Sequence, residues 1–214
     1  MSINNLLSRL TWLILFSIAM AFVESAVVVY LRAIFYPEGF SFPLSIGTDE
    51  KILVEVVREV ATIVMLLSIA GLAAHRLWER FACFMICFGI WDIFYYVWLK
   101  VLLDWPSSLF EWDVLFLIPL PWIGPVIAPA SMAVLMTIFG VLILHSCHHP
   151  KGFTPTRLAH VLAWAGVISV LYSFMYDTGA TLHQQMPLPY RYDLLIAGEV
   201  LVTAAFLMSY FRKG

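Results

Sequence analysis

Charged residues are scarce in this chain. Asp, Glu, Lys and Arg make up 12% of the 214 residues, whereas 62% are hydrophobic. A soluble domain of this length carries about a quarter charged residues. The composition therefore excludes an ordinary soluble domain and indicates a membrane protein that crosses the bilayer several times.

Motifs of several common protein classes are missing as well. The three cysteines do not suggest a disulfide framework, because Cys83 and Cys87 lie within an apolar run and Cys147 lies among residues of the predicted cytoplasmic side. The chain has no basic patch, and we expect no nucleic-acid partner. It also lacks a glycine-rich phosphate loop, a His-Glu-x-x-His helix and a serine nucleophile elbow. These absences exclude the enzyme classes that depend on those motifs.

Long apolar runs dominate what is present. We predict an all-α fold, a polytopic membrane bundle of six transmembrane helices that forms a single integral membrane domain over residues 1–214. The N-terminus resembles a signal peptide, with Ala19-Met20-Ala21 as a cleavage-like site, but the apolar run continues to Tyr30 and predicts a first membrane helix. The expected helices cover about 10–36, 50–74, 81–103, 125–145, 155–177 and 192–211.

The connection between the third and fourth helices has an apolar piece of its own, 114–122. Pro119, Pro121 and Pro125 make this segment a poor continuous helix. Non-helical backbone at membrane depth needs cover from protein. The sequence therefore predicts an interfacial or re-entrant hairpin at 104–124.

Basic residues are distributed unevenly between the two predicted sides. One side has a single acid, Glu79, whereas most acids fall on the other side. Since basic residues collect on the cytoplasmic side, we expect both termini in the cytoplasm and a location in the plasma (inner) membrane. The basic residues of the predicted cytoplasmic side are Arg9, Arg76, Arg80, Lys151, Arg157, Arg212 and Lys213.

An ionisable stripe interrupts the second apolar run, in the segment VEVVREVAT. Glu55, Arg58, Glu59 and Thr62 follow one another at i, i+3, i+4 and i+7, so a helix places them on one face. A charged stripe that faced lipid would cost several kcal/mol. We therefore predict that this face meets protein or water.

Acidic residues on other helices are expected at the same depth. With 1.5 Å of rise per residue, Glu24 and Asp92 lie about 15 Å, and Glu59 and Glu199 about 10–14 Å, below their outer helix ends. One arginine cannot neutralise all these carboxylates, so they would hold protons, bind a cation or be hydrated. The alternative is a structural ion-pair network of Arg58, Glu59 and Asp92. The predicted binding residues are Glu24, Glu55, Arg58, Glu59, Asp92, Tyr95, Tyr96, Asp177 and Glu199.

Histidines cluster near the predicted cytoplasmic side. Imidazole suits zinc, copper or iron, so the sequence leaves a metal ion open as a cofactor. The H-x-C-H-H spacing matches no closed zinc signature, and polar interfacial histidines are the alternative interpretation. The candidate ligands are His75, His145, His148, His149 and His160.

Three functions are compatible with these patterns. The first is binding, or transport, of a proton, a cation or a small cationic ligand by the buried carboxylates. The second is an intramembrane enzyme that uses the same carboxylates, or a metal, on a lipid-soluble substrate reached through an opening lined by Trp91 and Tyr96. The third is a non-catalytic subunit of a larger membrane complex or a homo-oligomer. In each case the lipid bilayer is the surrounding medium.

Overall fold

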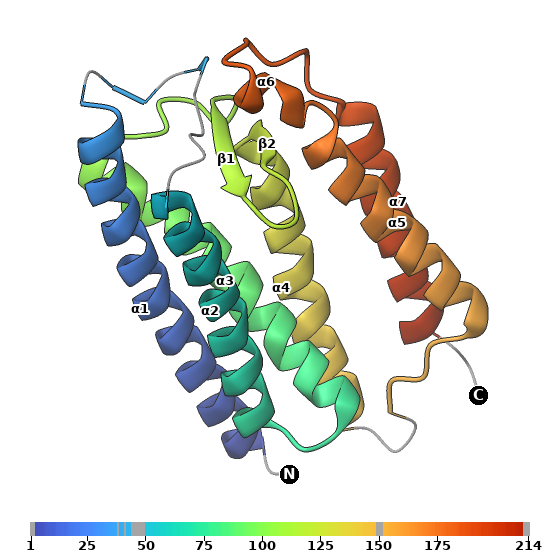
Figure 1. The fold of residues 1–214 in the computed structure, drawn as a ribbon. Coiled ribbons are helices and arrows are strands. Elements are labelled where there is room, and N and C mark those ends of the chain that lie inside the picture. The colour runs from blue at the N-terminus through green and yellow to red at the C-terminus, as the bar shows by residue number, and fades with distance from the viewer. Residues whose placement is uncertain (1–2, 38, 41, 44–49, 149–151, 212–214) are drawn as a thin grey trace.

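The computed structural model describes residues 3–37, 39–40, 42–43, 50–148 and 152–211. The fold is all-α and 74% helical, with one small β-hairpin. Long helices run side by side and the hairpin lies at one end of them (Figure 1). The elements are α1 (Ile3–Phe35), α2 (Glu50–Ala73), α3 (Leu77–Leu103), β1 (Trp112–Phe116), β2 (Trp122–Pro125), α4 (Ile127–Cys147), α5 (Arg157–Met175), α6 (Thr178–Leu182) and α7 (Tyr192–Tyr210).

Five of the described helices are long and apolar enough to cross a membrane, which suggests a multi-pass membrane protein. The predicted bundle of six spans is not confirmed, because α2 is not among these five. α2 carries three charged residues, Glu55, Arg58 and Glu59, within five positions of its N-terminal half. The five candidate spans are Leu6–Phe35, Leu77–Leu103, Ile127–Cys147, Arg157–Leu182 and Tyr192–Tyr210.

Several helix ends differ from the sequence expectation. α1 begins at Ile3 instead of near Leu10, so a polar first turn precedes the apolar run. α3 begins at Leu77, because residues expected in a charged turn continue the helix instead. α5 begins at Arg157, directly after the N-cap residue Thr156. The Thr156 hydroxyl accepts a hydrogen bond from the Ala159 amide at 3.1 Å. This side-chain cap satisfies one of the free amides of the first turn.

The connection between α3 and α4 forms a β-hairpin, and the structure does not support a re-entrant course for it. β1 and β2 are antiparallel, with Trp112 opposite Pro125 and Phe116 opposite Trp122. Prolines prevent a helix here, and the paired strands satisfy backbone groups that a loop would leave open. The hairpin turn points from one end of the bundle toward its interior (Figure 1).

The helices form two groups. α1, α3 and α4 share an apolar core that includes Leu13, Ile86 and Leu144, and α2 packs against α3. α5 and α7 form a tight pair, in which a Cβ atom on Gly198 would lie 2.7 Å from the backbone oxygen of Gly166. Direct packing between the two groups is sparse, and α5 with α7 stands apart from α4 in Figure 1. This arrangement leaves room between α3, α4 and α5.

Candidate functional site

A cavity of about 870 Å³ lies between the two helix groups and below the hairpin. Small-molecule sites usually measure about 300–1,000 Å³, so this cavity is large enough for a ligand. Its lining on α3 runs from Leu77 to Tyr96, which corresponds to about 28 Å of helix length. The cavity is therefore long, and its lining also includes residues of α1 and α2, such as Val28, Leu31 and Ile52.

The cavity wall is mainly apolar. On α3 the lining residues recur at helical spacing, as a stripe of large side chains on one face: Leu77, Trp78, Phe81, Phe84, Met85, Phe88, Trp91 and Tyr95. On the opposite wall, α5 contributes Ala163, Val167, Val170 and Phe174. The acidic residues of the lining come from α1, α2, α3 and β1 and include Glu24, Glu59 and Asp92, whereas His160 lies at the Trp78 end.

Arg58 on α2 is neutralised by two neighbouring carboxylates. Its guanidinium pairs with Glu24 of α1, and its Nε donates to Glu55 at 2.7 Å. Glu24 also accepts a hydrogen bond from Thr62 at 3.1 Å. The stripe expected from the sequence thus faces α1, and these contacts join α1 to α2. Arg58 bonds to Glu24 and Glu55, and neither Glu59 nor Asp92 is its bonded partner among the described residues.

Glu59 is bound by the hairpin backbone. The Leu117 amide lies 2.9 and 3.0 Å from the two Glu59 carboxylate oxygens and donates to them. The Glu59 side chain is buried and lines the cavity. This contact fixes the hairpin turn against α2 at the polar end of the cavity.

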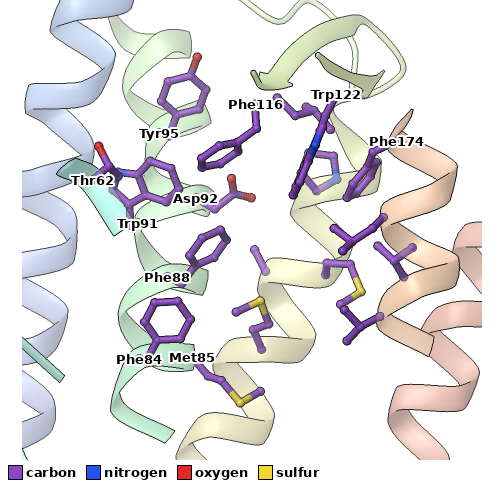
Figure 2. Close-up of a pocket in the computed structure, with 18 of the residues that line it drawn as sticks. Thr62, Phe84, Met85, Phe88, Trp91, Asp92, Tyr95, Phe116, Trp122 and Phe174 are labelled. Carbon is purple, nitrogen blue, oxygen red and sulfur yellow. The ribbon is translucent and has the colours of Figure 1, made fainter. Parts of the chain in front are cut away.

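Asp92 on α3 is the carboxylate without such a partner. Its Oδ2 atom is buried and has no hydrogen-bond partner within the described part of the chain. Figure 2 shows the Asp92 carboxylate projecting into the cavity, with Phe116 above it, Phe88 below it and Trp122 across from it. An acceptor in this position is available to a ligand.

The two neighbouring tyrosines have different surroundings. The Tyr95 hydroxyl points away from Asp92 toward the hairpin end (Figure 2). Tyr96 is buried, and its ring packs against Tyr95 at 5.0 Å and against Trp105 at 6.2 Å between centroids. Both tyrosines line the cavity.

Two predicted binding residues lie elsewhere. Glu199 on α7 accepts a hydrogen bond from Ser131 of α4 at 2.5 Å, so it links the two helix groups. Asp177 precedes α6 and accepts from the Leu188 amide at 2.7 Å. Neither residue is part of the cavity lining. A similar predicted depth in the membrane is therefore not sufficient to place an acidic residue at the cavity.

The candidate metal ligands are dispersed. Among the residues that the structure describes, no group of three or more His, Cys, Asp or Glu side chains could hold a metal ion. His75 lies between α2 and α3, His145 is in the last turn of α4, and His149 falls outside the described residues. His148 Nδ1 donates to the Leu144 carbonyl at 2.7 Å, since a carbonyl oxygen can only accept. His160 Nδ1 donates likewise to Thr156 at 2.8 Å, and His160 lines the cavity near its Trp78 end.

A buried ion pair near the hairpin was missed by the sequence reasoning. Arg32 of α1 donates to Asp113 of β1 at 3.2 Å, and its guanidinium lies 3.9 and 3.8 Å from the ring centroids of Phe40 and Trp105. Burial raises the pKa of Asp113 to about 6, although the Arg32 charge acts in the opposite direction. The sequence placed Arg32 near the outer end of the helix expected at 10–36 and Asp113 in the 104–124 connection, with nothing to pair them. A usable signal was Asp113 directly before the apolar strand residues 114–116.

Comparisons of the chain with protein-family models, with curated proteins and with solved structures give no match. The function must therefore be inferred from the cavity and the side chains around it.

Proposed function

We propose that this protein binds a lipid-soluble molecule in the cavity, with the cationic or hydrogen-bond-donating end of the molecule at Asp92 and Glu59. The observation that carries the proposal is the unpartnered Asp92 carboxylate at one end of a long apolar cavity. A site of this composition needs a ligand with an apolar body and one polar end.

The charges around the polar end favour a cation over an anion. Glu24 and Glu55 already neutralise Arg58, so this guanidinium has little capacity left for an anionic ligand. Glu59 and Asp92 would repel an anion from the same region of the cavity. A buried carboxylate without a partner is costly, and a ligand cation or donor would remove that cost.

The arrangement of α2 supports its role as a sixth membrane span. Its charged stripe faces α1 and the hairpin, so these groups are not presented to lipid. The opposite side of α2 is exposed and apolar at helical spacing, as expected for a lipid-facing surface: Leu53, Val57, Val60, Val64 and Leu67. We place both termini on the cytoplasmic side of the plasma membrane, following the distribution of basic residues.

The second candidate is an enzyme that acts on the bound molecule. It is favoured by one observation: Trp91 and Tyr96, which were expected to line an opening for a lipid-soluble substrate, both line the cavity beside Asp92. Asp92 would then transfer a proton to or from the substrate. Transport would require the same ligand to leave the cavity on the other side of the membrane.

Ligand extraction with a cavity-filling variant tests the proposal. Ala163 lines the cavity on α5, whereas Ala165 is exposed on the same helix and lies outside the lining. Ala163→Trp should abolish co-purification of an apolar molecule, measured by mass spectrometry of solvent extracts, and Ala165→Trp should not. Equal amounts of extracted molecule in both variants would overturn the proposal.

Asp92→Asn tests the polar end. The variant keeps the shape of the side chain but removes its charge, so we expect at least tenfold weaker retention of the extracted molecule with unchanged membrane insertion. Asp193→Asn is the matched control, because Asp193 is exposed and pairs with Arg191. Full retention by Asp92→Asn would show that this carboxylate does not bind the ligand.

A further inference from the structure

Four aromatic side chains surround the Asp92 carboxylate, and we call them the aromatic cage: Phe88, Trp91, Phe116 and Trp122. Neighbouring ring centroids are 5.3 Å apart for Phe88 and Trp91, 6.3 Å for Trp91 and Phe116, and 5.5 Å for Phe116 and Trp122. Two of these residues come from α3 and two are cross-strand partners in the hairpin. Figure 2 shows them around the end of the cavity into which Asp92 points.

Aromatic rings and a carboxylate in this arrangement favour one chemical group. Ring faces attract cations within about 6 Å of their centroids, and cages of rings are the common way in which proteins bind alkylated ammonium groups. The Asp92 carboxylate adds a negative charge in the same space. Together, rings and carboxylate compensate a positive charge that has been removed from water.

The hydrogen-bonding capacity of the cage distinguishes between kinds of ammonium group. A primary ammonium carries three N–H donors, each of which needs an acceptor when buried. The cage offers the Asp92 carboxylate as acceptor, while Trp91 and Trp122 supply only indole N–H donors. A trimethylammonium group has no N–H, so it adds no further unsatisfied donor to the two indole N–H groups.

We infer that the polar end of the ligand is a trialkylammonium group held in the aromatic cage against Asp92, with its alkyl chain extending along α3 toward Trp78. This inference rests on the proposed function, since it requires a ligand in the cavity. The distance along α3 from Asp92 to Trp78 is about 21 Å, and the lining between them is apolar. The ligand class is therefore a long-chain alkyltrimethylammonium compound.

The headgroup series that tests this inference uses four compounds with the same dodecyl chain. Dodecyltrimethylammonium, dodecylamine, dodecanol and dodecylphosphocholine are titrated into the purified protein in a maltoside detergent at pH 7.5. We expect dodecyltrimethylammonium to bind at least tenfold more tightly than the other three. Dodecylamine has the same charge, so it isolates the effect of N-methylation. The phosphate of dodecylphosphocholine tests whether an ordinary lipid headgroup is the source of the trimethylammonium group.

The variants test the cage itself. Trp122→Leu should weaken dodecyltrimethylammonium binding about 3- to 30-fold, the range between an exposed and a desolvated cation–π contact, and dodecanol binding clearly less. Trp12→Leu is the matched control, because Trp12 is 71% exposed on α1. Phe116→Leu replaces Trp122→Leu if the latter does not fold. Equal weakening of both compounds, or tighter binding of any other headgroup, would overturn the inference.

Chain length separates this inference from the proposed function. Each added CH₂ group should tighten binding about three- to fourfold until the apolar part of the cavity is filled, and Ala163→Trp should remove that dependence. If chain length matters but headgroup does not, the cavity binds a ligand of another class and the inference is wrong. If neither matters, the proposed function itself is wrong.

Discussion

Removal of the Arg58 guanidinium should destabilise the protein strongly. Arg58→Ala leaves Glu24 and Glu55 without their counter-charge, in positions where their side chains are 11% and 18% exposed. Breaking a fully buried pair costs about 3–5 kcal/mol. Because 23% of the Arg58 side chain is exposed, we expect about 3 kcal/mol, at the lower end of this range.

Thermal unfolding in detergent measures this effect. For a chain of this length, 1 kcal/mol shifts Tm by about 2–4 °C, so the expected loss is about 6–12 °C. Adding Glu24→Gln and Glu55→Gln to the same variant should restore much of the loss, because the uncompensated charges are then absent. Arg191→Ala is the control: its pair with Asp193 is at the surface, and such pairs contribute about 0–1 kcal/mol. A Tm of Arg58→Ala within 2 °C of the parent would refute the reasoning.

Other perturbations have equally definite outcomes. Gly198→Ala should lower Tm by the equivalent of about 1–3 kcal/mol, because its Cβ would meet the Gly166 oxygen, whereas Gly71→Ala enters open space and should raise Tm slightly. The Asp113 pKa of about 6 lies above the unfolded value of about 3.9, so folding favours the protonated carboxyl. Asp113 therefore makes its full contribution to the free energy of unfolding below pH 4, and this contribution is lost as the pH rises to 6. Tm should fall across this interval by the equivalent of about 3 kcal/mol, and Asp113→Asn should flatten that part of the profile; an unchanged slope would contradict the assignment. Arg32→Lys keeps the charge but loses the contact with two rings, so Tm should drop by the equivalent of about 1–2 kcal/mol.

The polar stripe of α2 was predicted mainly from helical periodicity. The i, i+3, i+4 and i+7 spacing of VEVVREVAT placed Glu55, Arg58 and Thr62 on one face, and in the structure that face meets Glu24. Periodicity specifies the face of a helix but not its neighbour. For this reason Glu199, at a comparable predicted depth, lies beside Ser131 and away from Arg58.

The hairpin and the cavity could not be derived in the same way. The prolines at 119, 121 and 125 excluded a helix, but they did not choose between a loop and paired strands. The partner of Glu59 is the backbone amide of Leu117, which no side-chain pattern reveals. An apolar residue such as Phe88 or Met85 gives the same sequence pattern whether it contacts lipid, the protein core or an open cavity. Only the packing of the helices shows which of the three it contacts.

The sparse packing between α4 and the α5–α7 pair has a consequence for how the purified protein should be handled. A molecule that fills the intervening space would contact both helix groups. The stability of the bundle should therefore increase with the fraction of protein that has the molecule bound. Harsh detergents that strip such a molecule would leave the two groups joined mainly by chain connections, the Ser131–Glu199 hydrogen bond and stacked aromatic pairs such as Phe139 and Phe206. Mild extraction with added amphiphile should therefore yield the more homogeneous preparation.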